Sequence, residues 1–493
     1  MEKLSYKTLS ESNYNGYILK DAPEKVLQFG EGNFLRAFVD YWFDLLNEKT
    51  GFNGKVVVSQ PIEQGLADMI NDQEGLYTLF LRGSENGQKV NKKRVISSIS
   101  RCLNPYKDYD ALMECASNPE LRYIVSNTTE AGIAYDPTCQ MTDKPASSFP
   151  AKLTAFLYQR FLNKLPGFVI LSCELIDHNG DELKKCVGQY IDQWNLGSDF
   201  KKWNDSENIF CSTLVDRIVP GYPRNEAASI CQELGYQDNL IDTGEVFGFW
   251  VIEGPQSIMQ ELKFDKAELP IIVVDNVTPY KQRKVRILNG AHTSFIMGAY
   301  LSGQNIVRDC MKDEVIHGFM NKTIYDEVIP TLDLPKDDLE QFASDVTERF
   351  SNPFVDHLLL SISLNSTSKW KARCMPSLLE FAARNNGKLP KCLTFSFAAY
   401  LCFYHNGQEK GDNSLIGKRN NDTYEIKDDA DVLDFYYDHR CDTLEELTHA
   451  VIDNEKFWDD SLKKLDGFEA EVIDDLKLIE KLGMYEAIKQ IIE

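Results

Sequence analysis

The chain has 493 residues, with 76 Asp and Glu against 53 Lys and Arg, which gives a formal net charge of −23. Nucleic-acid binding and docking on an anionic membrane both need a basic surface, so this balance argues against both classes. As a global sum, it disfavours an anionic substrate too. Apolar and aromatic residues make up 43% of the chain, enough at this length for two or three domains with their own cores.

Three features predict a cytoplasmic globular protein. The longest apolar run, Leu393 to Tyr404, is too short to span a membrane and has the length of a buried core helix. The first residues, MEKLSYKTLSESNY, lack the apolar middle of a signal peptide. The 12 cysteines include no C-x-x-C pair, which is typical of buried thiols in a reducing cytoplasm. The oligomeric state is left open.

The first half of the chain alternates short runs rich in Val and Ile with helical periodicity. Continuous runs of this kind, separated by helices, are typical of a parallel sheet covered on both faces, a doubly wound α/β domain. The predicted strands are Lys25–Phe29, Lys55–Ser59, Arg94–Ser100, Tyr123–Asn127, Phe168–Glu174 and Ile271–Asp275.

The β-type composition largely ends after Asp275. Apolar residues then recur at spacings of three and four, as in Phe468, Val472, Leu476 and Ile479, which indicates helices. We therefore predict an α/β plus α protein, with a Rossmann-like doubly wound domain over residues 1–277, an architecture that typically binds a dinucleotide. A mainly α-helical substrate and catalytic domain is expected over residues 278–493.

The first predicted strand runs into a glycine turn. Gly30 and Gly32 allow a tight turn and a close approach of backbone to a pyrophosphate, which the next helix would meet with its N-terminal amides. The third glycine of the usual pattern is replaced by Leu35. The alternative is a turn that uses glycine for its geometry alone. The candidate NAD-binding residues are Val26, Leu27, Gln28, Phe29, Gly30, Glu31, Gly32, Asn33, Phe34, Leu35, Arg36 and Ala37.

The second predicted strand lacks the acid that usually binds the ribose 2′-hydroxyl of NAD. It ends at Ser59 and is followed by Gln60, with Glu63 just beyond. Gln60 can hydrogen-bond a hydroxyl, and the sequence offers no adjacent Arg or Lys for a 2′-phosphate. These residues favour NAD over NADP by a modest margin.

A helix predicted from Thr278 carries three polar residues on one side. Thr278 and Pro279 suit the N-cap and the first helical position. At about 100° per residue, Lys284, Asn289 and His292 fall within an arc of about 140°. Oxidation of an alcohol needs a base for the hydroxyl proton and donors for the oxygen, which Lys284 and the Asn–His pair can supply. The alternative is a surface lysine beside a core Asn and His.

Five segments, in family order between residue 26 and about residue 375, resemble the zinc-independent long-chain polyol dehydrogenases, the mannitol dehydrogenase family. They are the G-x-G-x-F-x-R-A turn, SNTTEAG from residue 126, FCSTLVDRIVP from residue 210 and Lys284-x4-Asn289-x2-His292; RFSNP from residue 349 resembles a segment of the family's helical domain. The amino-acid sequence within these segments is most similar to that of family members that reduce a keto sugar acid. A small sugar-acid substrate and NAD are therefore implied.

The resemblance also implies roles for individual residues. Lys284 is the general base, and Asn289 and His292 surround the reacting oxygen. Asp216 and Arg349 match positions near the substrate, and the loop after residue 126 contributes Asn127, Thr129 and Glu130 to the cofactor site.

One family position differs in this chain. Mannitol-type members carry Cys-Asp-Asn where this chain reads Cys173-Glu174-Leu175, so the Asn that contributes to the oxygen site is missing. Either Asn179 replaces it or the site relies on Asn289 alone.

Other classes have less support in the sequence. The seven histidines show no H-x3-H spacing and no nearby Cys pair, so we predict no metal site. An NAD-retaining epimerase would need a second acid/base beside the glycine turn, and a non-catalytic NAD-binding regulator would not need Lys284. A fructuronate-type or mannitol-type dehydrogenase remains an alternative within the family. No motif in the sequence indicates the configuration at a single carbinol centre of the substrate.

The negative charge is unevenly distributed. Residues 411–493 hold 23 acidic and 10 basic residues, with the acids at helical spacing on an expected outer face. Around the expected site the sequence is basic instead. One or more of these cations, Arg349 first, is expected to bind a substrate carboxylate, because a guanidinium suits it. The others are Lys281, Arg283, Lys284, Arg286, Arg217, Arg224, Lys369, Lys371 and Arg373.

Overall fold

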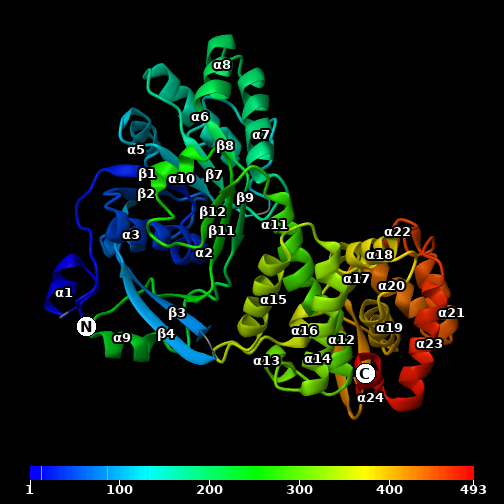
Figure 1. Cartoon of the computed structure of the whole chain (residues 1–493). Coiled ribbons are helices and arrows are strands. Elements are labelled where there is room, and N and C mark those ends of the chain that lie inside the picture. Colours follow the sequence, from blue (N-terminus) through cyan, green and yellow to red (C-terminus); the bar gives the residue numbers. More distant parts are fainter. Residues whose placement is uncertain (13, 86, 130) are drawn as a thin grey trace. The chain divides into compact units, whose positions relative to one another are not determined.

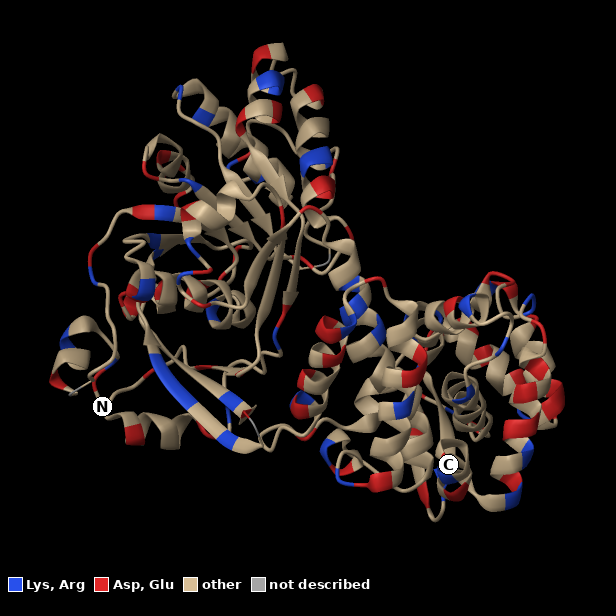
Figure 2. Ribbon diagram, viewed as in Figure 1, with Lys and Arg blue, Asp and Glu red and all other residues tan. Residues whose placement is uncertain are grey.

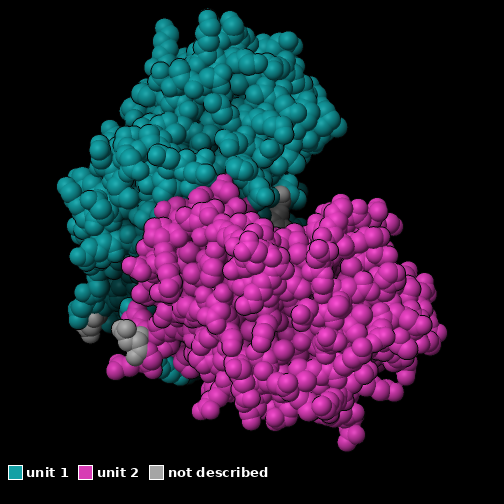
Figure 3. Space-filling view, turned by 45° about the vertical axis from the view of Figure 1, so that its right-hand side comes forward, with its two compact units in different colours: residues 1–83, 89–277 teal, residues 84–88, 278–493 magenta. Residues whose placement is uncertain are grey.

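The computed structural model describes every residue except 13, 86 and 130, and the chain divides into two compact units (Figure 3). Unit 1 comprises Met1–Gly83 and Lys89–Val277. Unit 2 comprises Ser84–Gln88 and Thr278–Glu493, so the tip of one β-hairpin groups with the C-terminal half.

The central sheet of unit 1 has six strands, and every neighbouring pair is parallel. Its order is β5-β2-β1-β6-β7-β8, which places the switch point between β1 and β6. Figure 1 labels β1, β2, β7 and β8 of this sheet. This is the order of a doubly wound dinucleotide-binding sheet, so the predicted Rossmann-like architecture is confirmed. The strands are β1 Glu24–Phe29, β2 Lys55–Ser59, β5 Ile99–Leu103, β6 Tyr123–Ser126, β7 Val169–Ser172 and β8 Ile209–Cys211.

Alternate residues of these strands enter two separate hydrophobic clusters, one on each face. Val26 and Val58 belong to the cluster that also holds side chains of α2, α3, α4 and α10. Leu27 and Val57 belong to the cluster built with α5, α6, α7 and α8. The helices of unit 1 are α1 Tyr6–Glu11, α2 Asn33–Ala37, α3 Val39–Thr50, α4 Ala67–Asp72, α5 Tyr109–Glu114, the 3-10 turn Cys115–Ser117, α6 Phe149–Leu162, α7 Asn179–Gln193, α8 Ser198–Glu207, α9 Ala227–Leu234 and α10 Ser257–Leu262.

Two smaller sheets complete unit 1, and they change two of the predicted strands. Residues Arg94–Ser100 form the end of β4 and the start of β5, which lie in different sheets, instead of one strand. The strand near Ile271 pairs with β11 in a three-stranded sheet outside the doubly wound one. The strands of these sheets are β3 Tyr77–Glu85, β4 Gln88–Ile96, β9 Thr213–Asp216, β10 Asp242–Glu245, β11 Phe249–Glu253 and β12 Ile271–Val274.

Unit 2 is mainly helical, and its two most apolar helices, α12 and α19, pack against each other at its centre. The apolar run Leu393 to Tyr404 lies in α19 and is buried almost throughout. A small antiparallel sheet, β13 Glu409–Gly411, β14 Ser414–Arg419 and β15 Asp422–Ile426, was not predicted. The helices are α11 Thr278–Arg283, the π-helix Lys284–Asn289, α12 Gly290–Leu301, α13 Val307–Cys310, α14 Glu314–Lys322, the π-helix Thr323–Val328, the 3-10 turn Ile329–Thr331, α15 Lys336–Phe350, α16 Leu359–Ile362, α17 Ser366–Arg373, α18 Met375–Arg384, α19 Lys391–His405, α20 Ala430–Asp438, α21 Leu444–Ile452, α22 Glu455–Trp458, α23 Phe468–Leu482 and α24 Met484–Ile492.

In the part of the chain that the structure describes, no helix combines the length and the apolar composition needed to cross a membrane.

Candidate active site

The glycine turn lies where β1 ends, at the switch point of the sheet. Gly30 has a φ of +123°, and a Cβ there would lie 2.9 Å from the Asn127 carbonyl oxygen, so both conformation and packing require glycine. Gly32 has an ordinary φ, and nothing lies within 4 Å of the place its Cβ would take. That open space beside the backbone fits the pyrophosphate of a dinucleotide, which glycine turns admit by close approach.

Leu35 occupies the position of the missing third glycine. Its side chain is buried, and its Cδ1 would lie 3.2 Å from a Cβ on Gly30. The helix after the turn is also interrupted: α2 ends at Ala37, Phe38 leaves the helical region, and α3 follows. The leucine therefore packs against the turn where a third glycine would allow closer contact between helix and strand.

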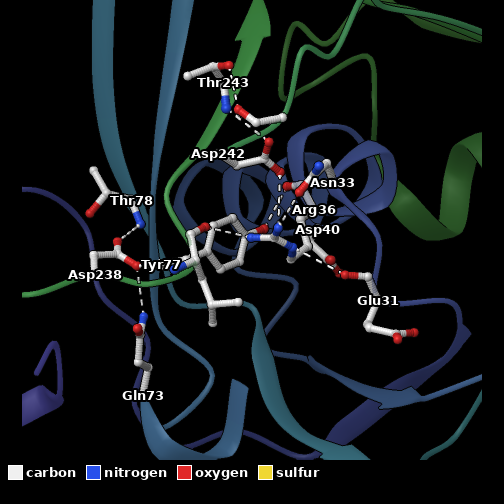
Figure 4. Close-up of polar contacts among 12 residues, drawn as sticks. Glu31, Asn33, Arg36, Asp40, Gln73, Tyr77, Thr78, Asp238, Asp242 and Thr243 are labelled. Atoms are coloured by element: carbon white, nitrogen blue, oxygen red, sulfur yellow. Dashed lines mark hydrogen bonds and ion pairs between the residues drawn. The ribbon is translucent and has the colours of Figure 1, made fainter. Parts of the chain in front are cut away.

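Arg36 braces the turn from its buried side (Figure 4). Its Nε donates to the Glu31 carbonyl at 3.2 Å, and its Nη2 donates to Asn33 Oδ1 at 2.6 Å. Its Nη1 donates to the Leu240 carbonyl at 2.6 Å, and its Nη2 lies 3.9 Å from the Asp242 carboxylate. The guanidinium thus supports the shape of the turn. The sequence predicted Arg36 as a residue of the cofactor site, and its side chain holds the backbone of that turn.

Gln60, after β2, is tied into its own loop. Its Nε2 donates to the carbonyls of Ile62 at 2.7 Å and Glu63 at 2.9 Å, and its Oε1 accepts from Ala67 N at 3.1 Å. Both amide hydrogens are therefore used inside the loop. The sequence offered Gln60 as a partner for a ribose hydroxyl, and the structure gives the side chain a structural role instead.

The loop after β6 is held by Glu174. This buried carboxylate accepts from Ser126 Oγ at 3.1 Å and from both the amide and the hydroxyl of Thr128 at 3.0 Å. Burial raises its pKa, and these hydrogen bonds oppose the rise. Thr129, next in the chain, has a φ of +72°, an uncommon conformation for a β-branched residue. Glu130 lies outside the described residues.

Asn127, at the carboxyl end of β6, belongs to the same edge of the sheet. Its amide donates to the Phe29 carbonyl at 3.1 Å, and its Nδ2 donates to the Cys173 carbonyl at 3.0 Å. The residue thus links β1, β6 and β7 beside the glycine turn.

Asn179 begins α7 and is fully engaged by backbone groups. Its Nδ2 lies within hydrogen-bond distance of the carbonyls of Ser172, Glu174 and Thr213, at 2.9, 2.9 and 3.1 Å. Its Oδ1 accepts from Thr213 N at 2.8 Å and from the next backbone amide at 2.9 Å. The side chain therefore joins β7, α7 and β9. Asp216, the other predicted substrate contact of unit 1, is buried at the end of β9.

Lys284 and Asn289 are the first and last residues of a π-helical segment, and His292 follows in the first turn of α12. The prediction of one continuous α-helix is wrong here, so the arc calculated at 100° per residue does not apply to residues 284–289. Short π-helical segments are rare and occur frequently at functional sites. The pKa of Lys281 is lowered, first by burial and second by the like charge of the nearby Lys284.

His292 is buried and stacked on Phe350, with ring centroids 3.9 Å apart and planes at 14°. The His357 ring meets it edge-on at 5.3 Å. Among the described residues, none gives His292 Nε2 a hydrogen-bond partner. A buried ring nitrogen without a partner is costly unless a ligand supplies one.

Cationic side chains surround this imidazole. Burial lowers the pKa of His292 well below its usual value, and four neighbouring groups lower it further: His357, Arg373, Arg349 and Lys369. The ring is therefore neutral at pH 7, with cations nearby. This combination can bind a hydroxyl or carbonyl oxygen on the histidine and an anion on the cations. Phe350 and His357 were missed in the sequence, where no spacing links them to the Lys–Asn–His set.

Charge elsewhere in unit 2 follows the predicted pattern. Acidic residues are frequent along α21 and α23 (Figure 2), and α23 carries Glu469, Glu471, Asp474, Asp475 and Glu480. Lys371, one of the cations expected near the site, forms an ion pair with Asp459 at 2.7 Å. Within the described ranges, no three His, Cys, Asp or Glu side chains are grouped to hold a metal ion.

Comparison with family models covers most of the chain. The model of the mannitol dehydrogenase Rossmann domain matches residues 24–266, and that of the mannitol dehydrogenase C-terminal domain matches residues 276–480. The chain belongs to the mannitol dehydrogenase family. The resemblance drawn from the glycine turn and the Lys–Asn–His spacing is thereby confirmed, and the chain is an oxidoreductase of that family.

Curated relatives match over nearly the whole chain. Altronate oxidoreductases of Escherichia coli O6:K15:H31 (strain 536 / UPEC) and of Shigella flexneri are each 45% identical over 496 residues. Each alignment covers 98% of this chain and 99% of the relative.

Two solved structures have a similar fold. A substrate-free D-sorbitol dehydrogenase has a TM-score of 0.81 at 22% identity and covers 98% of this chain and 100% of its own. Pseudomonas fluorescens mannitol 2-dehydrogenase, in a ternary complex with NAD and D-mannitol, has a TM-score of 0.70 at 22% identity, with 99% of each chain covered. These likenesses confirm the predicted fold class.

Proposed function

We propose that this chain is an NAD-dependent altronate oxidoreductase, which interconverts D-altronate and D-tagaturonate. The observation that carries the proposal is full-length identity of 45% to altronate oxidoreductases. The open space at Gly32 supports a dinucleotide, and the similarly folded mannitol 2-dehydrogenase was solved with NAD. The cations around His292 support an anionic sugar.

Lys284 is the proposed general base. NAD⁺, when bound, would supply the acceptor for the hydride that leaves the carbinol carbon of altronate. Lys284 Nζ takes the hydroxyl proton, so the C–H and O–H bonds break and the C=O bond forms. In the reducing direction, the Lys284 ammonium returns that proton to the carbonyl oxygen.

Asn289 and neutral His292 hold the reacting oxygen. His292 Nε2 is buried without a partner among the described residues, and a hydrogen bond to substrate would satisfy it. The stack on Phe350 fixes the plane of the ring, so the nitrogen is oriented before substrate binds. A neutral imidazole can also hydrogen-bond the reacting oxygen without competing with Lys284 for the hydroxyl proton of the substrate.

Arg349 is the first candidate for the substrate carboxylate, and Lys369 and Arg373 also act on His292 as neighbouring charges. A guanidinium binds a carboxylate with two parallel hydrogen bonds, which fixes orientation as well as charge. Asp216 is retained as a proposed substrate contact. We assign Asn179 to the scaffold, because its amide already joins three segments of unit 1.

The chain's thiols favour the cytoplasm as its location. All 12 cysteines are free, and 10 of them are buried. Free thiols in this number are typical of a reducing compartment.

The test is oxidation of NADH, followed by its ultraviolet absorbance, with tagaturonate, fructuronate and fructose offered in turn. Tagaturonate is expected to be the best substrate. A preference for fructuronate or fructose would keep the dehydrogenase and overturn the substrate. No oxidation with any of the three would overturn the proposed reaction.

A further inference from the structure

The ends of β1 and β2 lie side by side, and only the first carries a buried acid. The strands pair in parallel with Phe29 opposite Ser59, so Glu31 and Gln60 follow their strands at nearly the same level. The acid that usually binds the ribose of NAD stands at the end of the second strand. Here that place holds Gln60, whose amide hydrogens are used in its own loop, and Glu63 beyond it is exposed.

The Glu31 side chain reaches across to the loop that follows β2. Its Oε1 accepts from Leu66 N at 3.4 Å. A Cβ built on Gly65 would lie 2.3 Å from that same oxygen and 2.6 Å from Gln60 Cδ. The carboxyl group of Glu31 and the Gln60 side chain therefore both lie against Gly65, in the loop after the strand that usually ends in the acid.

The second carboxylate oxygen has no partner in the described part of the chain. Glu31 is 7% exposed, and its Oε2 is buried without a hydrogen bond. Arg36 does not neutralise it directly, because the guanidinium binds the Glu31 carbonyl and the side chain points away from it (Figure 4). A buried carboxylate oxygen needs a hydrogen-bond donor, and on the glycine turn the hydroxyl groups of a bound ribose could supply one.

We propose that Glu31 binds the adenosine ribose diol of the dinucleotide and excludes a 2′-phosphate by charge. This role rests on the proposed function for the class of cofactor. It places the specificity-determining acid on the glycine turn, between Gly30 and Gly32, and the brace from Arg36 fixes its backbone. Neither Gln60 nor Glu63 then selects NAD over NADP.

The test measures binding of NADH, NADPH and 2′-deoxy-NADH by titration calorimetry to wild type and Glu31→Gln. Because hydrogen bonds to a charged group contribute more than neutral ones, Glu31→Gln should weaken NADH binding about 10- to 100-fold. NADPH binding should be unchanged or tighter. Wild type should prefer NADH over 2′-deoxy-NADH, and the variant should lose most of that preference.

Two further variants separate this role from a structural one. Glu63→Gln is the matched control and should leave all three affinities unchanged. Gly65→Ala should displace the Glu31 carboxylate and shift selectivity in the same direction as Glu31→Gln. An equal loss of NADH and NADPH binding in Glu31→Gln, or an undiminished preference for the 2′-hydroxyl, would overturn the proposal.

The outcome also distinguishes failure of this inference from failure of the proposed function. A wild-type protein that binds neither NADH nor NADPH would overturn both. Binding that depends on Glu31, without oxidation of any of the three sugars, would overturn the reaction and keep the ribose contact. Tagaturonate reduction with unaltered selectivity in Glu31→Gln would keep the reaction and overturn the ribose contact.

Discussion

The polar side chains at the glycine turn of unit 1 and those around His292 in unit 2 differ in what they bind. In unit 1, Arg36, Gln60 and Asn179 form hydrogen bonds with the surrounding scaffold, mostly with backbone groups. In unit 2, His292 presents a buried nitrogen that no described residue satisfies. Saturated groups hold a shape, whereas an unsatisfied buried group at a candidate site can accept or donate a hydrogen bond when a ligand binds. Glu31, on the turn itself, differs from these three residues, because its Oε2 has no hydrogen-bond partner among the described residues.

The largest effect should come from the proposed base. Lys284→Ala removes the group that takes the substrate proton, so turnover should fall by about 10³-fold or more, as for other general bases. The dissociation constant of NADH should stay nearly unchanged, because the glycine turn is intact. Steady-state kinetics and calorimetry measure the two quantities.

Lys281→Ala is the companion variant for the base. It removes the neighbouring ammonium and leaves Lys284 in place, so its loss of turnover should be much smaller. If both alanine variants lose turnover equally, or if Lys284→Ala retains it, Lys284 is not the base.

The next effect concerns the substrate carboxylate. Arg349→Leu should lower kcat/KM for tagaturonate by about 10²-fold, the equivalent of roughly 3 kcal/mol for a lost charged pair. NADH affinity should be unaffected. Arg384→Leu is the control, since that exposed arginine pairs with Glu380 and Asp333. Equal loss of substrate turnover and NADH binding in Arg349→Leu would argue for a structural role instead.

The two glycines of the turn should separate shape from binding. Gly30→Ala forces a Cβ against the Asn127 carbonyl at a φ of +123°, so it should cost roughly 1–3 kcal/mol of unfolding free energy. Gly32→Ala meets nothing within 4 Å and should leave stability unchanged while weakening NADH binding about tenfold. Urea unfolding measures the unfolding free energy of each variant, and NADH titration measures its affinity for NADH. Unchanged NADH affinity in Gly32→Ala would mean that the open space is not the phosphate site.

The sequence predicted the fold better than it predicted strand boundaries. Uninterrupted Val and Ile runs identify β1, β2, β6 and β7, because strands buried on both faces have no polar alternation. The run RVISSIS was misread as one strand. Ser97 N donates to the Asp44 carboxylate, and Ser98 Oγ donates to the Asp40 carbonyl. These two bonds to α3 hold the residues between the end of β4 and the start of β5. Contacts of this kind join residues far apart in the chain and leave no local pattern.

For the candidate site, local spacing identified the glycine turn and the Lys–Asn–His set. It could not identify the π-helical segment between Lys284 and Asn289, which breaks the α-helical period. Nor could it show that Phe350 stacks on His292 or that Glu31 reaches Gly65, since both depend on tertiary packing. A sequence does not show which polar side chains have all their hydrogen bonds satisfied within the fold and which do not.

The smallest effect concerns the buried acids behind the turn. Burial raises the pKa of Asp40 to about 7, with Asp242 and Asp44 adding to the rise while Gln28 and Arg36 oppose it. Between about pH 4 and 7 the folded state therefore holds a proton that the unfolded state has lost, so raising the pH through this range lowers the unfolding free energy.

Asp40→Asn keeps an acceptor for Gln28, which donates to Asp40 at 3.1 Å, and removes the titration. It should be more stable than wild type, and its advantage should grow by roughly 1–2 kcal/mol between about pH 6 and pH 8. Urea unfolding at the two pH values measures this difference. An advantage that shrinks with rising pH would mean that the Asp40 carboxylate is stabilised by its surroundings, and that the saturated side of the turn includes this acid as well.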